Sequence, residues 1–218
     1  MAAHTRIKIC GLTNIEDVRA AVAYGADALG FIAVEGSPRY LDTQEHFEIW
    51  NLFTTPLFVP GVVVVRQPDD AEEYISDYVQ FYEEPPGGSR HMPVFDRGIR
   101  AFRVRDESAL GEIERYAASE NAAGALLLDT FHEDKLGGSG ETFNWDLAVE
   151  VKRIAANKPI ILAGGLTPEN VADAIAKVRP YAVDVSSGVE AEPGRKDHDK
   201  LRAFIRAVRA ADRLLDAA

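Results

Sequence analysis

The sequence predicts an α/β fold, and within that class a single (β/α)8 TIM barrel, from three observations. Eight short apolar runs rich in Val, Ile and Leu recur along the chain, and longer segments of helical period separate them. Such alternation is typical of βα units around a parallel sheet. The 218 residues lie near the lower limit of ~200 residues for a closed barrel of eight units. The expected strands are residues 6–10, 28–33, 61–65, 78–82, 99–104, 124–129, 159–163 and 182–185.

Three helices have recognisable signals. Thr13, with Glu16 three residues later, has the spacing of a capping box and predicts a helix start after the first strand. Thr167 followed by Pro168 predicts an N-cap and a first-turn proline. In the last helix, apolar side chains fall on one face and arginines on the other. The apolar side chains are Leu201, Phe204, Ile205, Val208 and Leu215, and the arginines are Arg202, Arg206 and Arg209.

The fourth βα unit is irregular. Residues 83–97 contain prolines and glycines that disfavour any helix longer than one turn. We therefore expect a shortened or missing fourth helix. No long linker, low-complexity tract or change of composition interrupts the chain, so we assign residues 1–218 to one domain. The residues that disfavour the helix are Pro85, Pro86, Gly87, Gly88 and Pro93.

The composition excludes several classes of protein. The chain is 46% apolar and 27% charged, which is ordinary for a globular protein, and its formal net charge of -11 disfavours a nucleic-acid partner. A single cysteine excludes an internal disulfide, and Cys10 has no neighbour at metal-ligand spacing, so we expect a reducing compartment and no metal. Without an apolar leader or a membrane span, we expect a cytoplasmic location and no membrane partner.

The first strand ends in a candidate catalytic residue, because active sites of this fold lie at the carboxyl ends of the strands. Strand alternation places Lys8 and Cys10 inside the barrel, and Ile7 and Ile9 toward the helices. Cys10 is either a small buried residue or a reactive thiol. A cation on the same face, and a helix N-terminus nearby, favour the thiolate. Lys8 needs a buried counter-charge, and Asp184 on the eighth strand is the expected partner.

The sixth strand ends in the second candidate, Asp129. This residue is either part of a turn or an acid. The following segment, 131–145, contains three glycines and is long enough to be a mobile lid. Burial beneath such a lid would let the carboxyl group keep its proton near neutral pH.

Two glycine-rich turns, after strands seven and eight, form the third candidate group. They contain Gly164 and Gly165 in the first turn, and Ser186, Ser187 and Gly188 in the second. Backbone amides in such turns bind anions, and this is the usual phosphate location in the fold. The alternative is that both are only tight turns.

Arg39, in the loop after the second strand, is the best second contact for an anion. A guanidinium binds a carboxylate through two parallel hydrogen bonds. The alternative is a solvated surface arginine. The acidic net charge does not exclude an anionic ligand, because distant surface charges are screened beyond ~8 to 10 Å.

These residues lie in motifs that closely resemble those of the phosphoribosylanthranilate isomerase family. The resemblance extends from about residue 6 to residue 204. The motifs are KICGLTN at 8–14, GF at 30–31 with SPRY at 37–40, LLDT at 127–130 with GGSG at 137–140 and TF at 142–143, AGGL at 163–166, and DVSSGVE at 184–190.

The resemblance implies an isomerase of tryptophan biosynthesis that works without a cofactor. The implied reaction is the Amadori rearrangement of N-(5'-phosphoribosyl)anthranilate to 1-(2-carboxyphenylamino)-1-deoxyribulose 5-phosphate. The resemblance implies that Cys10 is the general base, that Asp129 is the general acid and that Arg39 binds the anthranilate carboxylate. The implied phosphate ligands are the amides around Gly164, Gly165, Ser187 and Gly188.

The chain departs from the family pattern at two strands. Tyr82 and Glu83 stand where the family usually has His and Gly, and Arg66 is an extra cation expected to face the substrate. Two alternatives stay open. One is a related phosphosugar isomerase of the histidine or tryptophan pathways, which uses an aspartate at the position of Cys10. The other is a non-catalytic barrel that binds phosphometabolites. The expected partner is a phosphosugar carrying anthranilate, bound by a monomer or a homodimer.

Overall fold

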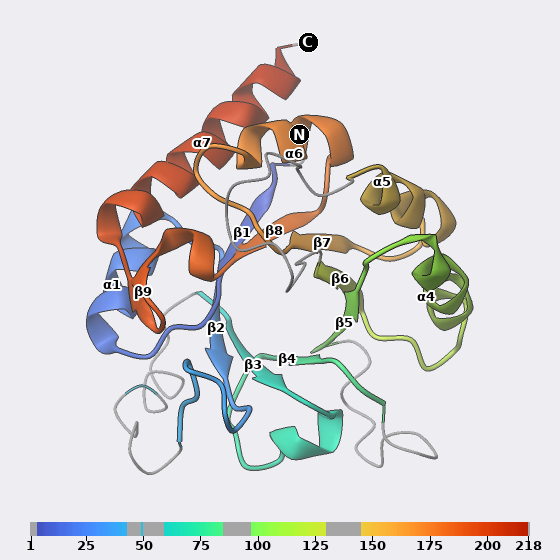
Figure 1. Ribbon diagram of the computed structural model, residues 1–218, viewed down its shortest axis with the longest axis horizontal. Coiled ribbons are helices and arrows are strands. Elements are labelled where there is room, and N and C mark those ends of the chain that lie inside the picture. The colour runs from blue at the N-terminus through green and yellow to red at the C-terminus, as the bar shows by residue number, and fades with distance from the viewer. Residues whose placement is uncertain (1–3, 43–48, 50–58, 85–96, 130–144, 218) are drawn as a thin grey trace.

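The structure is a computed structural model that describes residues 4–42, 49, 59–84, 97–129 and 145–217. Eight parallel strands form a closed barrel in which each pairs with the next along the chain and β8 closes against β1 (Figure 1). The predicted fold class and all eight strands are confirmed, with strand ends within one residue of those expected. The strands are β1 (Arg6–Ile9), β2 (Ala28–Ile32), β3 (Gly61–Val65), β4 (Tyr78–Phe81), β5 (Gly98–Arg103), β6 (Ala125–Asp129), β7 (Ile160–Ala163) and β8 (Ala182–Val185).

Each strand presents one face to the barrel interior and the other to the surrounding helices. Ile7 and Ile9 of β1 are fully buried in the large apolar cluster between the strands and the helices, as predicted. Lys8, on the other face, lies opposite Asp184 of β8 in the strand register. A smaller apolar cluster fills the interior and includes Val62, Ile99, Ala101, Leu127, Ile161, Ala163 and Ala182.

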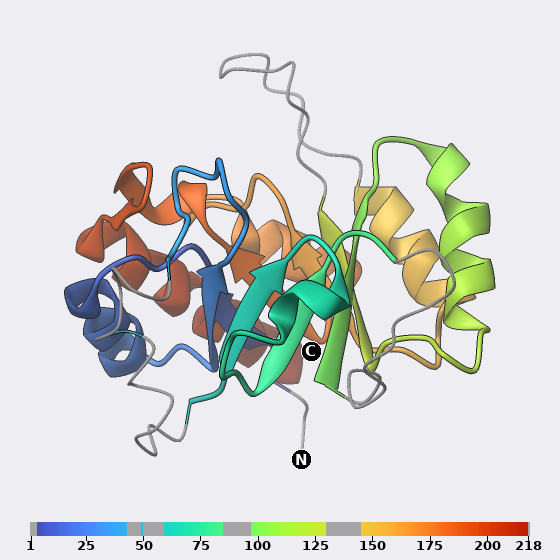
Figure 2. The same ribbon diagram turned by 90° about the horizontal axis from the view of Figure 1, so that it is seen from below.

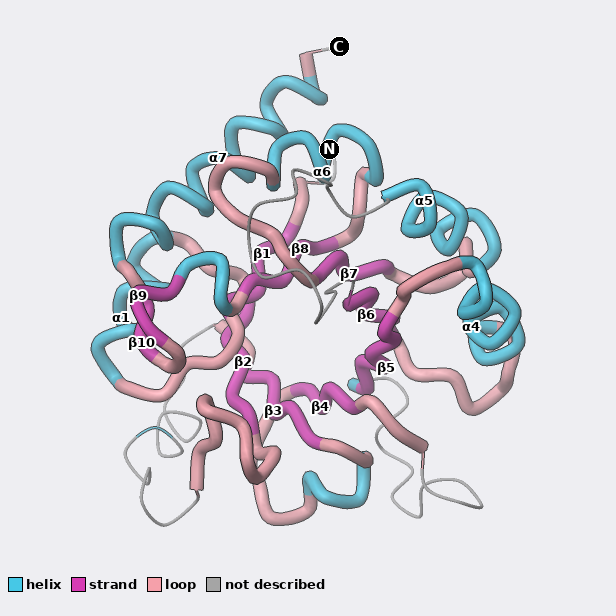
Figure 3. The backbone as a smooth tube through the Cα atoms, viewed as in Figure 1, coloured by secondary structure: helices cyan, strands magenta, loops and turns pink. Residues whose placement is uncertain are grey.

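The described α-helices lie outside the barrel along β1 and β5 to β8 (Figure 3). The last helix, α7 (His198–Asp216), packs against α1 (Ile15–Tyr24) and α6 (Val171–Val178). The predicted apolar positions Leu201, Phe204 and Val208 are fully buried. The α-helices are α1 (Ile15–Tyr24), α4 (Leu110–Ala117), α5 (Trp145–Ile154), α6 (Val171–Val178) and α7 (His198–Asp216). Short 3₁₀ turns are η2 (Pro68–Ala71), η3 (Glu107–Ala109) and η4 (Ser187–Val189).

A small hairpin that the sequence did not predict lies between β8 and α7. Its strands are β9 (Glu190–Glu192) and β10 (Arg195–Lys196), which pair antiparallel beside α1. The side view shows this segment and the loop after β2 at the same end of the barrel (Figure 2). That end holds the carboxyl termini of the barrel strands.

The predicted capping box at Thr13 is wrong. Helix α1 begins one residue later than that pattern requires, and its N-cap is Asn14, whose Oδ1 accepts a hydrogen bond of 2.9 Å from the amide of Asp17. The hydroxyl of Thr13 instead donates to the carbonyl oxygen of Gly194 in the β9–β10 turn. Asn is a somewhat better N-cap than Thr, and the tertiary contact of Thr13 favours the same choice.

The helix after β7 also begins later than predicted. Pro168 lies in a turn, and α6 begins at Val171. Thr167 still acts as a cap, because its hydroxyl oxygen accepts a hydrogen bond of 3.3 Å from the amide of Glu169. The capping signal therefore marks the preceding turn and not the first helical residue.

Two expectations concern segments that lie mostly outside the described residues: the shortened or missing fourth helix at 83–97, and the lid at 131–145. The structure does not describe residues 85–96 and 130–144. The described strands and helices all belong to one barrel and its surrounding layer, while the assignment of residues 1–218 to one domain stays a prediction. None of the helices in the described ranges is both long and apolar enough to cross a membrane.

Candidate active site

A cavity of about 350 Å³ opens where the barrel strands end. Two larger cavities, of about 700 and 490 Å³, lie at the opposite end, where the strands begin, and contain none of the predicted site residues. Size therefore does not identify the site, whereas the convergence of predicted residues does. The smaller cavity is lined by all eight of them: Cys10, Arg39, Asp129, Gly164, Gly165, Ser186, Ser187 and Gly188.

Cys10 is fixed at the end of β1 and packs closely against β2. Its side chain is buried, and its amide donates to the carbonyl oxygen of Val185 at 2.9 Å. Gly30 leaves the space for the thiol, because a Cβ at this position would lie 2.8 Å from Cys10 Sγ and 3.0 Å from Lys8 Nζ. The thiol and the ammonium thus share the space over one glycine.

The predicted pair of Lys8 and Asp184 is confirmed. Lys8 Nζ donates to Asp184 Oδ1 at 2.9 Å, and both side chains are buried. Burial lowers the pKa of Lys8, but the carboxylate of Asp184 and the neighbouring Cys10 outweigh it, so the pKa lies above its ordinary value. Lys8 is therefore a permanent cation beside the thiol.

The cation beside Cys10 favours the thiolate as expected, but burial outweighs its effect on the pKa of the thiol. Burial raises the pKa of the thiol, the ammonium groups of Lys8 and Lys196 lower it, and the carboxylate of Asp184 raises it, with a net upward shift. The sequence shows the neighbouring cation but not the depth of burial, and desolvation disfavours the charged form.

Asp129 reaches the same cavity from the far side of the barrel. It ends β6, where its carbonyl oxygen accepts a hydrogen bond of 3.0 Å from the amide of Val104. Tyr82 also lines the cavity, and burial, with the charge of Asp129 next in effect, raises the pKa of its hydroxyl. Tyr82 is therefore a neutral hydrogen-bonding group. Arg66 is exposed and does not line the cavity, which corrects the expectation that it faces the substrate.

The two glycine-rich turns lie against each other. A Cβ at Gly188 would lie 1.9 Å from the carbonyl oxygen of Leu166, so only glycine lets the turns after β7 and β8 approach this closely. Ser187 and Gly188 begin the turn η4, and the first amides of a helical turn have no partner within it. The buried Ser186 Oγ has no hydrogen-bond partner in the part of the chain that the structure describes. Together these donors suit an anion with several oxygens.

Arg39 lines the cavity but is already engaged on one side. Its Nε and Nη2 donate to the two carboxylate oxygens of Glu190 at 2.8 and 2.6 Å. These hydrogen bonds raise the pKa of Arg39, and the guanidinium is partly buried rather than a solvated surface group. Sequence reasoning missed the role of Glu190, whose only signal is its place in the DVSSGVE motif.

Gln80 is a second residue that sequence reasoning missed. It lies on β4, lines the cavity and is buried, and its Oε1 has no hydrogen-bond partner among the described residues. A polar residue on the inward face of a strand, with apolar neighbours, is the signal that would have found it. Gln80 offers an unused acceptor to a ligand hydroxyl.

Comparison with known proteins gives a consistent result. Residues 7–207 match the family model described as N-(5'phosphoribosyl)anthranilate (PRA) isomerase. This chain belongs to the phosphoribosylanthranilate isomerase family. The enzyme of that name from Geobacter metallireducens is 44% identical over 94% of this chain and 99% of its own length. Its counterpart from Pelobacter propionicus is 47% identical over 92% of this chain and 94% of its own length.

Solved phosphoribosylanthranilate isomerases also share the fold. The crystal structure from Thermotoga maritima has a TM-score of 0.79 at 38% identity and covers 94% of this chain and 99% of that chain. Another structure of the family, at 34% identity and a TM-score of 0.76 with the same coverage, holds reduced 1-(o-carboxyphenylamino)-1-deoxyribulose 5-phosphate. The family recognised from the motifs is confirmed, and with it the activity: an aldose-ketose isomerase of tryptophan biosynthesis.

Proposed function

We propose that this chain isomerises N-(5'-phosphoribosyl)anthranilate in the cavity of about 350 Å³, with Cys10 as general base and Asp129 as general acid. One observation supports this most directly: a thiol and a carboxyl group from opposite sides of the barrel line the same cavity as Arg39 and the two anion-binding turns. A phosphosugar that carries an aromatic carboxylate needs both kinds of contact.

The proposed reaction begins at the ribose ring. Asp129 donates a proton to the furanose oxygen, the C1–O bond breaks, and the nitrogen lone pair forms a Schiff base with C1. Cys10, as the thiolate, removes the proton from C2, and the electron pair moves toward the nitrogen to give an enolamine. Tautomerisation yields the ketone at C2. Each positioned acid or base contributes about 10² to 10⁴ in rate. C1 is reduced as C2 is oxidised, so electrons balance within the substrate.

The anionic ends of the substrate define the rest of the proposal. Arg39 binds the anthranilate carboxylate. The phosphate is bound by the turns that follow β7 and β8. The two anion sites hold the ribose between the thiol and the carboxyl group. The proposed phosphate ligands are Gly164, Gly165, Ser186, Ser187 and Gly188.

The test follows the fluorescence of phosphoribosylanthranilate generated in the cuvette from anthranilate and phosphoribosyl pyrophosphate. We expect rapid decay with the wild-type protein, and loss of at least about 10²-fold in kcat with Cys10→Ala and with Asp129→Asn. Decay equal to wild type in either variant would remove the assigned role of that residue. Binding without turnover by the wild type would favour the non-catalytic barrel.

The remaining parts of the proposal concern the state of the protein in the cell. One solved relative, from Thermotoga maritima, is described as a dimeric phosphoribosylanthranilate isomerase from which monomers were generated. Monomer or homodimer therefore stays a prediction for this chain, and so does the cytoplasmic location. Light scattering coupled to gel filtration distinguishes the two oligomeric states.

A further inference from the structure

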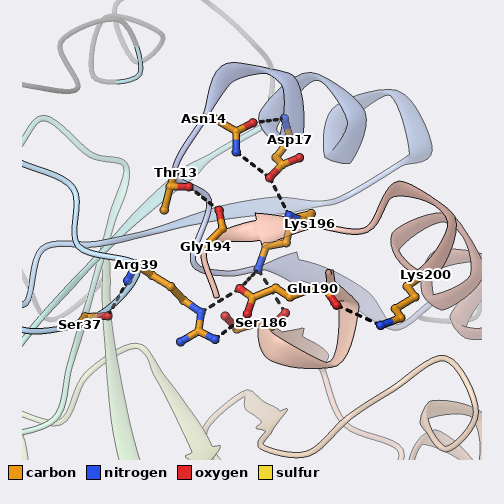
Figure 4. A network of polar contacts seen from close by, with 10 residues as sticks. All are labelled: Thr13, Asn14, Asp17, Ser37, Arg39, Ser186, Glu190, Gly194, Lys196 and Lys200. Carbon is orange, nitrogen blue, oxygen red and sulfur yellow. Dashed lines mark hydrogen bonds and ion pairs between the residues drawn. The ribbon is translucent and has the colours of Figure 1, made fainter. Parts of the chain in front are cut away.

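Behind Arg39, a buried carboxylate joins two cations (Figure 4). Glu190 Oε1 accepts from Arg39 Nε and from Lys196 Nζ, each at 2.8 Å, and Oε2 accepts from Arg39 Nη2 at 2.6 Å. The side chain of Glu190 is 5% exposed and that of Lys196 is fully buried. We call these three residues the Glu190 cluster. Its formal charge is one positive unit, from two cations and one anion.

Among the residues that the structure describes, the Glu190 cluster leaves one edge of the guanidinium without a partner. A guanidinium has five N–H donors, and the edge formed by Nε and Nη2 is occupied by Glu190. The stem of Arg39 packs against Gly11, where a Cβ would lie 2.5 Å from Arg39 Cδ. With one edge and the stem fixed, the edge formed by Nη1 and Nη2 is the one left to bind a ligand carboxylate in the cavity.

Lys196 decides the charge that this edge presents. Arg39 and Glu190 alone are a neutral pair, and a carboxylate approaching the guanidinium would also meet the negative charge of Glu190. The buried ammonium of Lys196 offsets that charge at 2.8 Å. The same ammonium donates to the carbonyl oxygen of Ser186 at 3.2 Å, so it also holds the start of the turn η4.

The position of Lys196 is set by helix α1. The amide of Lys196 donates to Asp17 Oδ2 at 2.8 Å, and Asp17 is buried. Asn14 Nδ2 donates to the same oxygen at 2.8 Å, and Thr13 donates to the carbonyl oxygen of Gly194 (Figure 4). These hydrogen bonds attach the turn and strand β10 of the hairpin to the start of α1, so the backbone that carries the ammonium is held in place.

We propose that Glu190 and Lys196 are positioning residues for the substrate: Glu190 orients the guanidinium of Arg39, and Lys196 restores its net positive charge for an aromatic carboxylate. This inference rests on the proposed role of Arg39. A merely structural role of the Glu190 cluster would affect all ligands equally. The proposed role affects only those with the carboxylate.

The experiment compares two ligands by titration calorimetry. One is reduced 1-(o-carboxyphenylamino)-1-deoxyribulose 5-phosphate, and the other is the same compound with a phenyl group in place of carboxyphenyl. In Lys196→Met we expect the Kd of the first ligand to rise at least about tenfold more than that of the second, because one unit of charge is lost near the carboxylate. Loss of the hydrogen bond to the carbonyl oxygen of Ser186 affects both ligands alike. Lys200→Met is the matched control. It removes a lysine ammonium that donates to the backbone carbonyl of Glu190, not to its carboxylate.

A second variant separates orientation from charge. Glu190→Gln raises the positive charge of the cluster by one unit but replaces the two charged acceptors of Arg39 with one neutral acceptor. If only charge mattered, the carboxyphenyl ligand would bind more tightly. We expect it to bind about tenfold more weakly, since two parallel hydrogen bonds fix the plane of the guanidinium. Tighter binding would overturn the orienting role of Glu190.

The outcomes also separate this inference from the proposed function. Wild-type turnover of phosphoribosylanthranilate is measured in parallel, and its absence overturns both. Normal wild-type turnover with an unchanged ratio of the two Kd values in Lys196→Met overturns only the inference. An equal loss for both ligands assigns Lys196 a structural role and overturns it as well. If Lys196→Met does not fold, as judged by circular dichroism, Lys196→Gln is measured instead. This variant keeps a hydrogen-bond donor without the charge, and we expect the same result.

Discussion

Removing the carboxylate of Asp184 should strongly destabilise the protein. Lys8 Nζ lies 2.9 Å from Asp184 Oδ1, and the two side chains are only 4% and 9% exposed. Asp184→Asn keeps the shape but leaves an ammonium inside the barrel without a counter-charge. Removal of one partner of a buried pair costs about 3–5 kcal/mol. Domains have ~5–15 kcal/mol of stability, so we expect the free energy of unfolding to fall by about a fifth or more at neutral pH.

The pH dependence of this loss follows from the pKa of Lys8. In the wild type, burial lowers the pKa of Lys8, but Asp184 and Cys10 outweigh it, so the pKa is raised. The pair therefore stabilises the fold fully below the unfolded-state pKa of ~10.4. This stabilisation is lost as the pH rises through the folded-state pKa. In Asp184→Asn burial dominates, and the folded-state pKa falls below the unfolded-state value. That variant therefore gains stability as pH rises, and the gap to wild type narrows toward pH ~10.

The assay is urea unfolding followed by tryptophan fluorescence, at fixed protein concentration and at several pH values. Lys8→Met with Asp184→Leu is the matched double variant, and we expect it to be close to wild type because no unpaired charge remains. A loss below about 1 kcal/mol for Asp184→Asn at neutral pH, or a gap independent of pH, would refute the reasoning. The reasoning would also be refuted if the double variant lost as much free energy of unfolding as Lys8→Met and Asp184→Leu lose together.

Three further predictions concern the thiol and the chain end. Gly30→Ala should lower kcat by about 10 to 100-fold in the fluorescence assay, because its Cβ would lie 2.8 Å from Cys10 Sγ; wild-type kcat would contradict this. The pH profile of kcat/KM should rise with a midpoint above ~8.5, because burial raises the pKa of Cys10. In Cys10→Asp the midpoint should lie at least about two pH units lower. A midpoint that does not move would exclude Cys10 as the group that titrates. Asp212→Ala should cost about 2–4 kcal/mol in urea unfolding, because Thr5 N and Oγ1 lose their acceptors at 3.1 and 2.7 Å; Asp212→Asn, the control, should lose less.

The strands could be predicted because their burial pattern is local. Ile7 and Ile9 alternate with Lys8, and the alternation is visible within five residues of sequence. The inward direction of Lys8 then required a partner, and Asp184 is the inward acid on the strand that closes the barrel. Once the barrel was inferred, strand order alone brought Cys10 and Asp129 to the same end.

What could not be predicted depends on contacts between distant parts of the chain. Arg39 and Glu190 are 151 residues apart, and nothing local to either indicates the other. The β9–β10 hairpin is too short and too charged to show alternation. The start of α1 depended on whether Thr13 or Asn14 capped it, and the contact of Thr13 with Gly194 decides this. The direction of the pKa shift of Cys10 required the depth of burial, which no sequence pattern gives.

The charges of the site explain how a protein of formal net charge -11 can bind a substrate with two anionic ends. Lys8 and Asp184 form a neutral pair, so they place a cation beside the thiol without adding net charge to the cavity. The Glu190 cluster supplies one positive unit where a carboxylate is expected, and the turns after β7 and β8 supply neutral amide donors at the proposed phosphate site. At contact distance these groups act in a medium of low dielectric constant, while the acidic surface is separated by screening water. Raising the salt concentration should therefore weaken substrate binding less than replacing Lys196 does.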